Sequence, residues 1–239
     1  MKHLLFISLF LIILLLSSCL RSTSVGAIFP EPPVTPVTAD TVGKSYLALG
    51  DSYTIGQGVI EQERYPAQAA AMLVSQGMKF LPVKYIAQTG WTTGNLAAAI
   101  ASQNLTGSYD IVTLLIGVND QYQKNDTTGY RLSFAMLLKT AVHLAGERSK
   151  RVIVLSIPDY GVTSFGAGWP NVSIQIDAFN AINKSVTDSY DIAYLNITEI
   201  SRKAAGAPGL ILDGGPHFTG AEYALWAAPL SGLMAKALK

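Results

Sequence analysis

Short runs of apolar residues recur along the chain, separated by longer stretches of helical character. The runs are rich in β-branched and aromatic residues and lie at 45–49, 80–87, 111–116, 152–157 and 192–195. The stretches that follow them predict helices at 66–74, 94–101, 130–144, 172–190 and 220–238. Strands that alternate with helices in this way indicate repeated βαβ units and a parallel sheet.

The composition of the strands indicates that helices cover both faces of this sheet. The run Ile111-Val112-Thr113-Leu114-Leu115-Ile116 is apolar almost throughout and does not alternate with polar residues. Continuous runs of this kind are typical of a parallel sheet that is buried on both sides. We therefore predict an α/β fold, a three-layer α/β/α sandwich with a five-stranded parallel sheet.

The first 19 residues have the pattern of an export signal. Lys2 precedes an almost unbroken apolar run that ends at Ser17-Ser18-Cys19. A charged start, a short apolar run and small residues are typical of a signal peptide, and the run is short for a membrane span. Leu16-Ser17-Ser18-Cys19 also resembles the bacterial lipoprotein box, in which the signal is cut before a cysteine that becomes lipidated.

Cys19 is the only cysteine of the chain, so no intramolecular disulfide can form. A lipid anchor is its natural use, and an ordinary signal peptide with an incidental cysteine is the alternative. The resemblance implies an exported lipoprotein on the periplasmic or cell-surface face, held to the membrane only through Cys19.

The rest of the chain predicts a tether and one domain. Residues 20–42 hold four prolines among small residues and predict an extended tether, and residues 43–239 are enough for one buried core. Residues 1–19 contain one of the 17 basic residues and no acidic one, so 16 basic and 16 acidic residues remain. This balance gives no electrostatic reason to expect a nucleic-acid partner.

Polar clusters follow the first three predicted strands. They are Gly50-Asp51-Ser52, Gln88-Thr89-Gly90-Trp91 and Gly117-Val118-Asn119-Asp120. Ligands of parallel α/β sheets bind beyond the carboxyl ends of the strands. We therefore expect the three clusters at one edge of the sheet, with Ser52 as a candidate nucleophile.

A serine attacks a carbonyl only when a base takes its proton and donors stabilise the oxyanion. His3 lies in the apolar N-terminal segment and His143 in a predicted helix. His217 lies in a glycine-rich loop before the last helix, a usual place for catalytic groups. By elimination His217 is the candidate base, and a structural or surface histidine is the alternative.

With these residues the chain resembles the SGNH (GDSL-type) hydrolase family, named for a serine, a glycine, an asparagine and a histidine in four blocks. Gly50-Asp51-Ser52 matches the first block, Thr89-Gly90 the second, Gly117-x-Asn119-Asp120 the third and the loop 213–217 the last. The resemblance covers nearly the whole domain. It implies a flavodoxin-like α/β/α fold and a serine esterase that needs no metal or cofactor.

Each matched residue has a physical role in ester hydrolysis. Ser52 attacks the ester carbonyl, and the N–H of Ser52, the N–H of Gly90 and the Asn119 amide donate to the oxyanion. His217 accepts the serine proton and returns it to the leaving alcohol. Asp51 is interpreted, like Asp120, as a loop-fixing acceptor. A plain turn glycine and a turn or cap asparagine are the alternatives for positions 90 and 119.

The carboxylate that should orient His217 departs from the family pattern. The last block usually reads Asp-x-x-His, whereas Asp213 stands four residues before His217, with Gly214, Gly215 and Pro216 between. The two glycines allow the loop to bulge, so we predict Asp213 as the acid of the site. A Ser-His pair oriented by a backbone carbonyl or by Asp159 is the alternative.

Motifs of other enzyme classes are absent from the sequence. It has no Gly-x-Ser-x-Gly elbow and no phosphate-binding Gly-x-x-x-x-Gly-Lys-Ser/Thr loop, and Gly56-Gln57-Gly58 lacks the third glycine of a dinucleotide site. With one cysteine and an isolated His217, we do not expect a zinc site.

Export and loop aromatics favour a carbohydrate substrate. Trp91, Tyr122, Tyr160 and Trp169 lie near the expected edge and have rings suited to stacking on sugars, although loop aromatics also form small local cores. The leading hypothesis is therefore a serine esterase for short acyl esters, such as carbohydrate O-acetyl groups, with a small-molecule or glycan ester as partner. The alternatives are a lysophospholipase or thioesterase of the same family, and a non-catalytic glycan-binding surface lipoprotein.

Overall fold

The structure is a computed structural model that describes residues 42–105, 107–207 and 209–239. The predicted signal, Cys19 and all but the last residue of the predicted tether lie outside this part of the chain, so the lipid anchor stays a prediction. Within the described ranges, no helix combines the length and the apolar character needed to cross a membrane.

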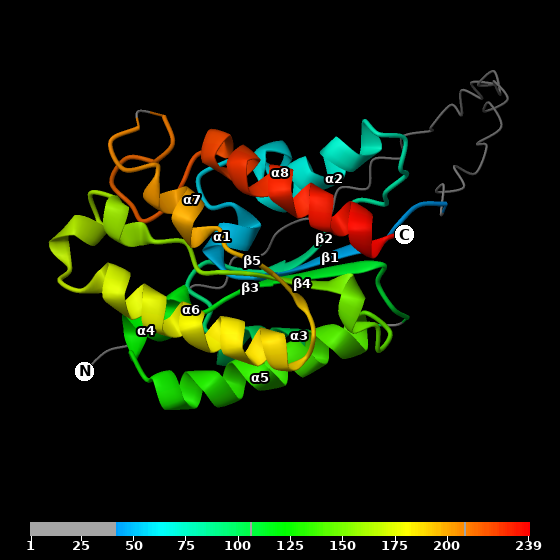
Figure 1. Cartoon of the computed structure of the whole chain (residues 1–239), viewed down its shortest axis with the longest axis horizontal. Helices are drawn as coiled ribbons and strands as arrows, with labels where there is room; N and C mark the ends of the chain where they lie inside the picture. Colours follow the sequence, from blue (N-terminus) through cyan, green and yellow to red (C-terminus); the bar gives the residue numbers. More distant parts are fainter. Residues whose placement is uncertain (1–41, 106, 208) are drawn as a thin grey trace, which may run out of the picture. The chain divides into compact units, whose positions relative to one another are not determined.

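Five parallel strands form one sheet in the described part of the chain, in the order β2-β1-β3-β4-β5 (Figure 1). The strands are β1 (Tyr46–Gly50), β2 (Lys84–Ala87), β3 (Ile111–Leu115), β4 (Val152–Leu155) and β5 (Ala193–Leu195). This is the flavodoxin-like strand order, which has its ligand crevice where the order switches between β1 and β3. It confirms the predicted α/β fold.

The register of the sheet brings the ends of three strands together. Gly50, the last residue of β1, pairs with Ala87 on one side and with Leu115 on the other. Ala87 and Leu115 are the last residues of β2 and β3. The loops that follow these strands therefore emerge side by side, as the sequence pattern predicts.

Helices pack on both faces of the sheet. On one face α2 (Tyr65–Val74) contacts α8 (Gly220–Ala237), and on the other α5 (Thr127–Leu144) contacts both α3 (Thr93–Ser102) and α6 (Val172–Ser189) (Figure 1). The short helices are α1 (Ser52–Ile55), α4 (Val118–Gln123) and α7 (Thr198–Arg202), with 3-10 turns at Glu61–Glu63, Ser149–Arg151, Tyr160–Val162 and Gly166–Gly168.

Burial explains why the strands read as continuous apolar runs. Every residue of the central strands β1, β3 and β4 is buried, because helices cover both of their sides. The edge strands β2 and β5 are partly exposed, which agrees with their lysine and tyrosine residues. The core is thus centred on the strands that deliver the candidate site.

The boundaries of some elements differ from those that the pattern predicts. β2 begins at Lys84 and not at residue 80, because Pro82 has no N–H to donate to a ladder. α5 begins at Thr127, three residues early, because the Asp126 side chain caps it by accepting bonds from the N–H groups of Thr128 and Gly129.

An aromatic cluster joins α1, α2, α8 and the loop that precedes α8. The Trp226 ring centroid lies 4.8 Å from that of Tyr223, 5.5 Å from Phe218 and 6.3 Å from Tyr53. Tyr65 of α2 lies 6.2 Å from Trp226. Because Phe218 follows His217 directly, this cluster fixes the histidine loop against the helix that begins at Ser52.

Candidate active site

Ser52 is the first residue of α1 and follows β1 after a single residue. The turn between them needs a glycine, because a Cβ on Gly50 would overlap the Leu115 carbonyl and the Thr54 side chain. Ser52 is 5 % exposed, and its hydroxyl makes no hydrogen bond with the described residues. The fold therefore brings an unengaged serine hydroxyl to the end of the central strand.

Asp51 and Asp120 hold the loops around this serine. Asp51 Oδ1 accepts a bond from the Tyr53 N–H at 3.0 Å and so caps α1. Asp120 accepts from the N–H and the hydroxyl of Thr93, at 2.9 and 2.6 Å, and so fixes the start of α3. Burial, reinforced by the nearby Asp120, raises the pKa of Asp51 to about 8, so this carboxyl is mostly neutral at pH 7. These contacts agree with a loop-fixing role for both aspartates.

Gly90 and Asn119 come to the pocket from the loops after β2 and β3. Gly90 has a φ of +82°, a backbone conformation that L side chains rarely adopt. Asn119 Nδ2 donates to the Trp91 carbonyl at 3.0 Å, and Gln123 Nε2 donates to the Gly90 carbonyl at 3.2 Å. An amide nitrogen carries two hydrogens, so Asn119 has a second one to donate. The bond from Asn119 to Trp91 thus fixes the Gly90 loop and also orients the Asn119 amide.

His217 lies at the opposite wall of the cleft, just before α8. Its backbone carbonyl accepts a bond from the Leu212 N–H at 3.0 Å, next to an antiparallel bridge between Ile211 and Phe218. The imidazole is half-buried and makes no hydrogen bond with the described residues. Burial lowers its pKa below the ordinary value of a histidine.

This burial predicts the pH dependence of any reaction in which His217 is the base. The neutral imidazole persists at pH values at which an exposed histidine, with a pKa of about 6.5, is protonated. We therefore expect kcat/KM to rise with pH through an apparent pKa below about 6.5 and then to level off. The pH profile of kcat/KM with p-nitrophenyl acetate measures this apparent pKa. A rising limb centred at or above pH 6.5 would contradict the prediction.

Asp213 does not contact His217 in the structure. Its side chain is exposed, and no hydrogen bond or ion pair joins it to the described residues. Gly214, with a φ of +74°, stands where the usual Asp-x-x-His pattern has its acid. The prediction that Asp213 orients His217 therefore finds no contact that supports it here.

Asp159, the alternative partner, is engaged elsewhere. One carboxylate oxygen accepts from Arg202 Nε at 2.9 Å, and the other accepts from the Gly161 N–H at 2.8 Å. Arg202 also pairs with Asp177 and Glu199. Asp159 is 1 % exposed and belongs to a structural ion-pair network next to the 3-10 turn Tyr160–Val162. Both of its oxygens are thus bound to groups other than the histidine.

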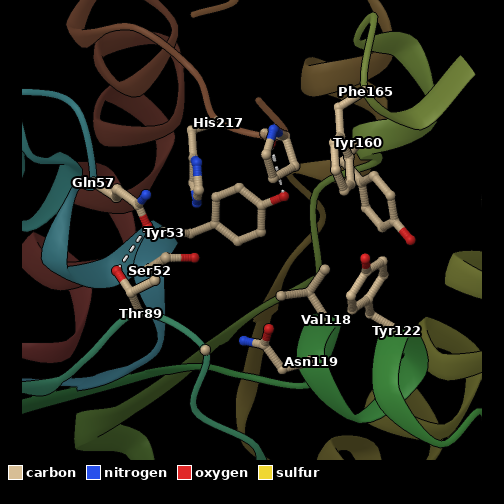
Figure 2. Close-up of a pocket in the computed structure, with 12 residues that line it drawn as sticks. Ser52, Tyr53, Gln57, Thr89, Val118, Asn119, Tyr122, Tyr160, Phe165 and His217 are labelled. Atoms are coloured by element: carbon tan, nitrogen blue, oxygen red, sulfur yellow. Dashed lines mark hydrogen bonds between the residues drawn. The ribbon is translucent and has the colours of Figure 1, made fainter. Parts of the chain in front are cut away.

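Ser52, Gly90, Asn119 and His217 line one pocket of about 200 Å³. Figure 2 shows Ser52 and His217 on one side of this pocket and Asn119 below them. The other lining residues are Tyr53, Gln57, Thr89, Val118, Tyr122, Tyr160, Phe165 and Pro216. The structure thus brings together the four residues for which the SGNH family is named.

Aromatic rings form the side of the pocket opposite Ser52 and His217 (Figure 2). The Phe165 ring lies 6.1 Å from the rings of both Tyr122 and Tyr160, and Trp169 continues the row at 5.4 Å from Tyr122. Tyr122 is 45 % exposed and Trp169 is 50 % exposed, so both present faces to solvent. We refer to Tyr122, Tyr160, Phe165 and Trp169 as the aromatic wall.

Two aspects of this lining differ from the sequence-based expectation. Trp91 and Trp169 are both outside the lining; the Trp91 backbone carbonyl orients Asn119, and the Trp169 ring packs against Tyr122 and Phe165. Phe165 and Gln57 are lining residues that the pattern did not single out. Phe165 lies in an irregular stretch between two 3-10 turns, where no periodicity marks a residue as facing a site.

No cluster of three or more metal-ligating side chains occurs among the described residues. The pocket itself supplies a serine hydroxyl, an imidazole and N–H donors. These are the components of nucleophilic acyl transfer.

Comparisons with known proteins agree with this arrangement. The chain matches the sequence model of the GDSL-like Lipase/Acylhydrolase family over residues 48–225. No curated protein sequence gives a significant match. The family match covers the last three residues of β1, all four residues of the pocket constellation and the start of α8.

Solved structures with the same fold include enzymes of this type. The lipase/acylhydrolase from Enterococcus faecalis is 18% identical, with a TM-score of 0.63 over 81% of this chain and 96% of that one. The acetylxylan esterase Axe2 from Geobacillus stearothermophilus is 17% identical, with a TM-score of 0.63 over 80% and 94%.

A third similar structure is esterase EstA from Pseudoalteromonas sp., inhibited by monoethylphosphonate, which is 15% identical with a TM-score of 0.59 over 81% of this chain and 97% of that one. Identities this low show the shared fold alone, whereas the family match extends over most of the chain. The chain is therefore a hydrolase that belongs to the GDSL-like lipase/acylhydrolase family.

Proposed function

We propose that the protein is a serine esterase in which Ser52 is the nucleophile and His217 the general base. The observation that carries the proposal is that Ser52, Gly90, Asn119 and His217 line a single pocket although they come from four separate segments of the chain. The unengaged serine hydroxyl and the neutral, half-buried imidazole support the same roles.

The proposed reaction has two steps. Ser52 Oγ attacks the ester carbonyl carbon while His217 takes its proton, and the carbonyl electron pair moves to the oxygen. The N–H groups of Ser52 and Gly90 and the second amide hydrogen of Asn119 donate to that oxyanion. Its collapse expels the alcohol, which takes the proton from His217. Water, deprotonated by His217, then attacks the acyl carbon, and cleavage of the bond to Ser52 Oγ releases the acid while His217 returns the proton to Oγ.

We retain Asp213 as the proposed acid of this site, acting in a closed form of the loop. Gly214 and Gly215 precede Pro216, and the space where a Cβ on Gly214 would lie is open, so the loop has room to turn. Exchange of Asp213 for asparagine tests the role: unchanged esterase activity would remove Asp213 from the mechanism.

A short acyl group on a carbohydrate is the substrate class that we propose. The pocket of about 200 Å³ is smaller than the roughly 300–1,000 Å³ of common ligand pockets, which favours a small acyl group. The exposed faces of Tyr122 and Trp169 suit a sugar ring in the alcohol part. The acetylxylan esterase of similar fold supports the same class.

Acyl-chain profiling tests this substrate class. We expect kcat/KM for p-nitrophenyl esters to be highest with acetate and to fall as the acyl chain lengthens, because longer chains exceed the pocket. Highest rates with octanoate or longer esters would favour a lysophospholipase or thioesterase. A protein that binds acetylated xylooligosaccharide but cleaves no ester would be the glycan-binding lipoprotein.

We also propose that the protein is exported and held on a membrane surface by lipid on Cys19. The support is the sequence alone, in which an apolar run ends at Leu16-Ser17-Ser18-Cys19 and is followed by a proline-rich stretch. More than one acyl chain on the cysteine would make such an anchor stable.

A further inference from the structure

We propose that Tyr53 is a positioning residue that holds His217 in place for its role as base. The inference rests on the proposed function, because it concerns the same histidine, and it adds a residue that the serine, glycine, asparagine and histidine blocks do not contain. It starts from an unusual feature of the site: His217 has no carboxylate partner among the described residues.

A hydrogen bond joins Tyr53 to the residue just before the histidine. Tyr53 Oη donates to the Pro216 carbonyl oxygen at 3.0 Å, and the tyrosine is 1 % exposed. The Pro216 carbonyl and the His217 N–H belong to one planar peptide group. The bond therefore fixes the orientation of the peptide plane that enters His217.

The peptide plane that leaves His217 is fixed as well. The His217 carbonyl accepts a bond from the Leu212 N–H at 3.0 Å. With both planes held, the direction of the Cα–Cβ bond of His217 is set, and only the side-chain torsions remain. Leu212 acts through backbone alone, so Tyr53 is the side chain on which this arrangement depends.

The Tyr53 ring limits the remaining freedom of the imidazole. Its centroid lies 5.5 Å from that of His217, with the planes inclined by 59°. The tyrosine is itself held by Phe218 at 6.1 Å and Trp226 at 6.3 Å. Figure 2 shows this ring between the His217 imidazole and the aromatic wall, with a dashed line from its hydroxyl.

The sequence of the loop explains why such support is needed. Gly214 has a φ of +74°, and Gly214 and Gly215 together give the segment before Pro216 wide conformational freedom. Without the Tyr53 bond, nothing else among the described residues holds the Pro216 carbonyl. Small displacements of a catalytic group, of about 1 Å, cost about 100-fold in rate.

The test is exchange of Tyr53 for phenylalanine, which keeps the ring and removes only the hydroxyl. We expect kcat for p-nitrophenyl acetate to fall about 10- to 100-fold while KM stays within about twofold, because the base is displaced while the Tyr53 ring that lines the pocket is kept. Tyr65→Phe is the matched control. Tyr65 is fully buried in the same aromatic cluster, and its hydroxyl pairs with Thr54, away from the histidine loop.

Tyr53→Leu is the second variant, because it removes the ring as well and is expected to lower kcat further. The inference is overturned if Tyr53→Phe keeps wild-type kcat, if its loss lies in KM, or if Tyr65→Phe loses as much kcat as Tyr53→Phe. A wild-type protein that cleaves no ester and is not labelled by a fluorophosphonate would overturn the proposed function itself, and this inference with it. A wild type that is active beside an equally active Tyr53→Phe overturns only the role of Tyr53.

Discussion

Exchange of Ser52 for alanine is expected to abolish ester hydrolysis, with a loss on the order of 10⁶-fold in kcat. The hydroxyl is the only protein group in the proposed mechanism that forms a bond with the substrate carbon, so no neighbouring side chain can replace it. Its side chain makes no hydrogen bond with the described residues, so the melting temperature should stay close to that of the wild type. Initial rates with p-nitrophenyl acetate and a thermal melt measure both quantities.

Ser102→Ala is the matched control for this variant. Ser102 is the last residue of α3, is exposed and bonds only to the Ala99 carbonyl. Its replacement should leave kcat unchanged. Ester hydrolysis that survives Ser52→Ala within about tenfold would refute Ser52 as the nucleophile.

Exchange of His217 for alanine should cost nearly as much, because a serine hydroxyl without a base is a poor nucleophile. We again expect a loss on the order of 10⁶-fold in kcat. Since Ser52 and His217 act as one unit, the double variant should be no slower than either single variant. Rates of the three variants with one activated ester measure this non-additivity.

His143→Ala is the matched control, because it removes a histidine that lies outside the pocket. His143 is exposed on α5, and its Nδ1 lies 2.7 Å from Glu147 Oε1 in an i,i+4 pair. Exposed ion pairs of this kind contribute little to the stability of the fold, so ester hydrolysis should not change. Activity that is lost equally in His143→Ala and His217→Ala would contradict the assignment of the base.

The fold was predictable where burial dominates. Strands β1, β3 and β4 are apolar on both sides because helices cover both faces, and this pattern is visible in the sequence. The short helices α4 and α7 were not predicted, because six and five residues are too few to establish a helical period. Their placement depends on tertiary contacts, such as those of Asp120 with Thr93.

The candidate site was predictable to the extent that it follows the strand ends. Ser52, Gly90 and Asn119 occupy the segments that directly follow β1, β2 and β3, and parallel register brings those segments together. His217 comes from a loop far along the chain, and it reaches the same pocket because the aromatic cluster around Trp226 holds that loop against α1.

Two parts of the site depend on geometry that a sequence does not carry. The bond from Tyr53 to Pro216 joins positions 163 residues apart and involves a backbone oxygen that every residue has. The aromatic wall assembles from α4 and from irregular turns after β4, where neither period nor motif predicts which rings face a pocket. The exposed position of Asp213 likewise depends on the loop conformation at Gly214.

Covalent labelling of the full chain with a fluorophosphonate tests the central claim most directly, because the probe reacts only with an activated serine. The expected result is one probe per chain on Ser52, identified by mass spectrometry of the peptide that contains it. Labelling should be absent in Ser52→Ala and strongly slowed in His217→Ala. A wild type that does not react, or a Ser52→Ala variant that is labelled equally, would contradict the account.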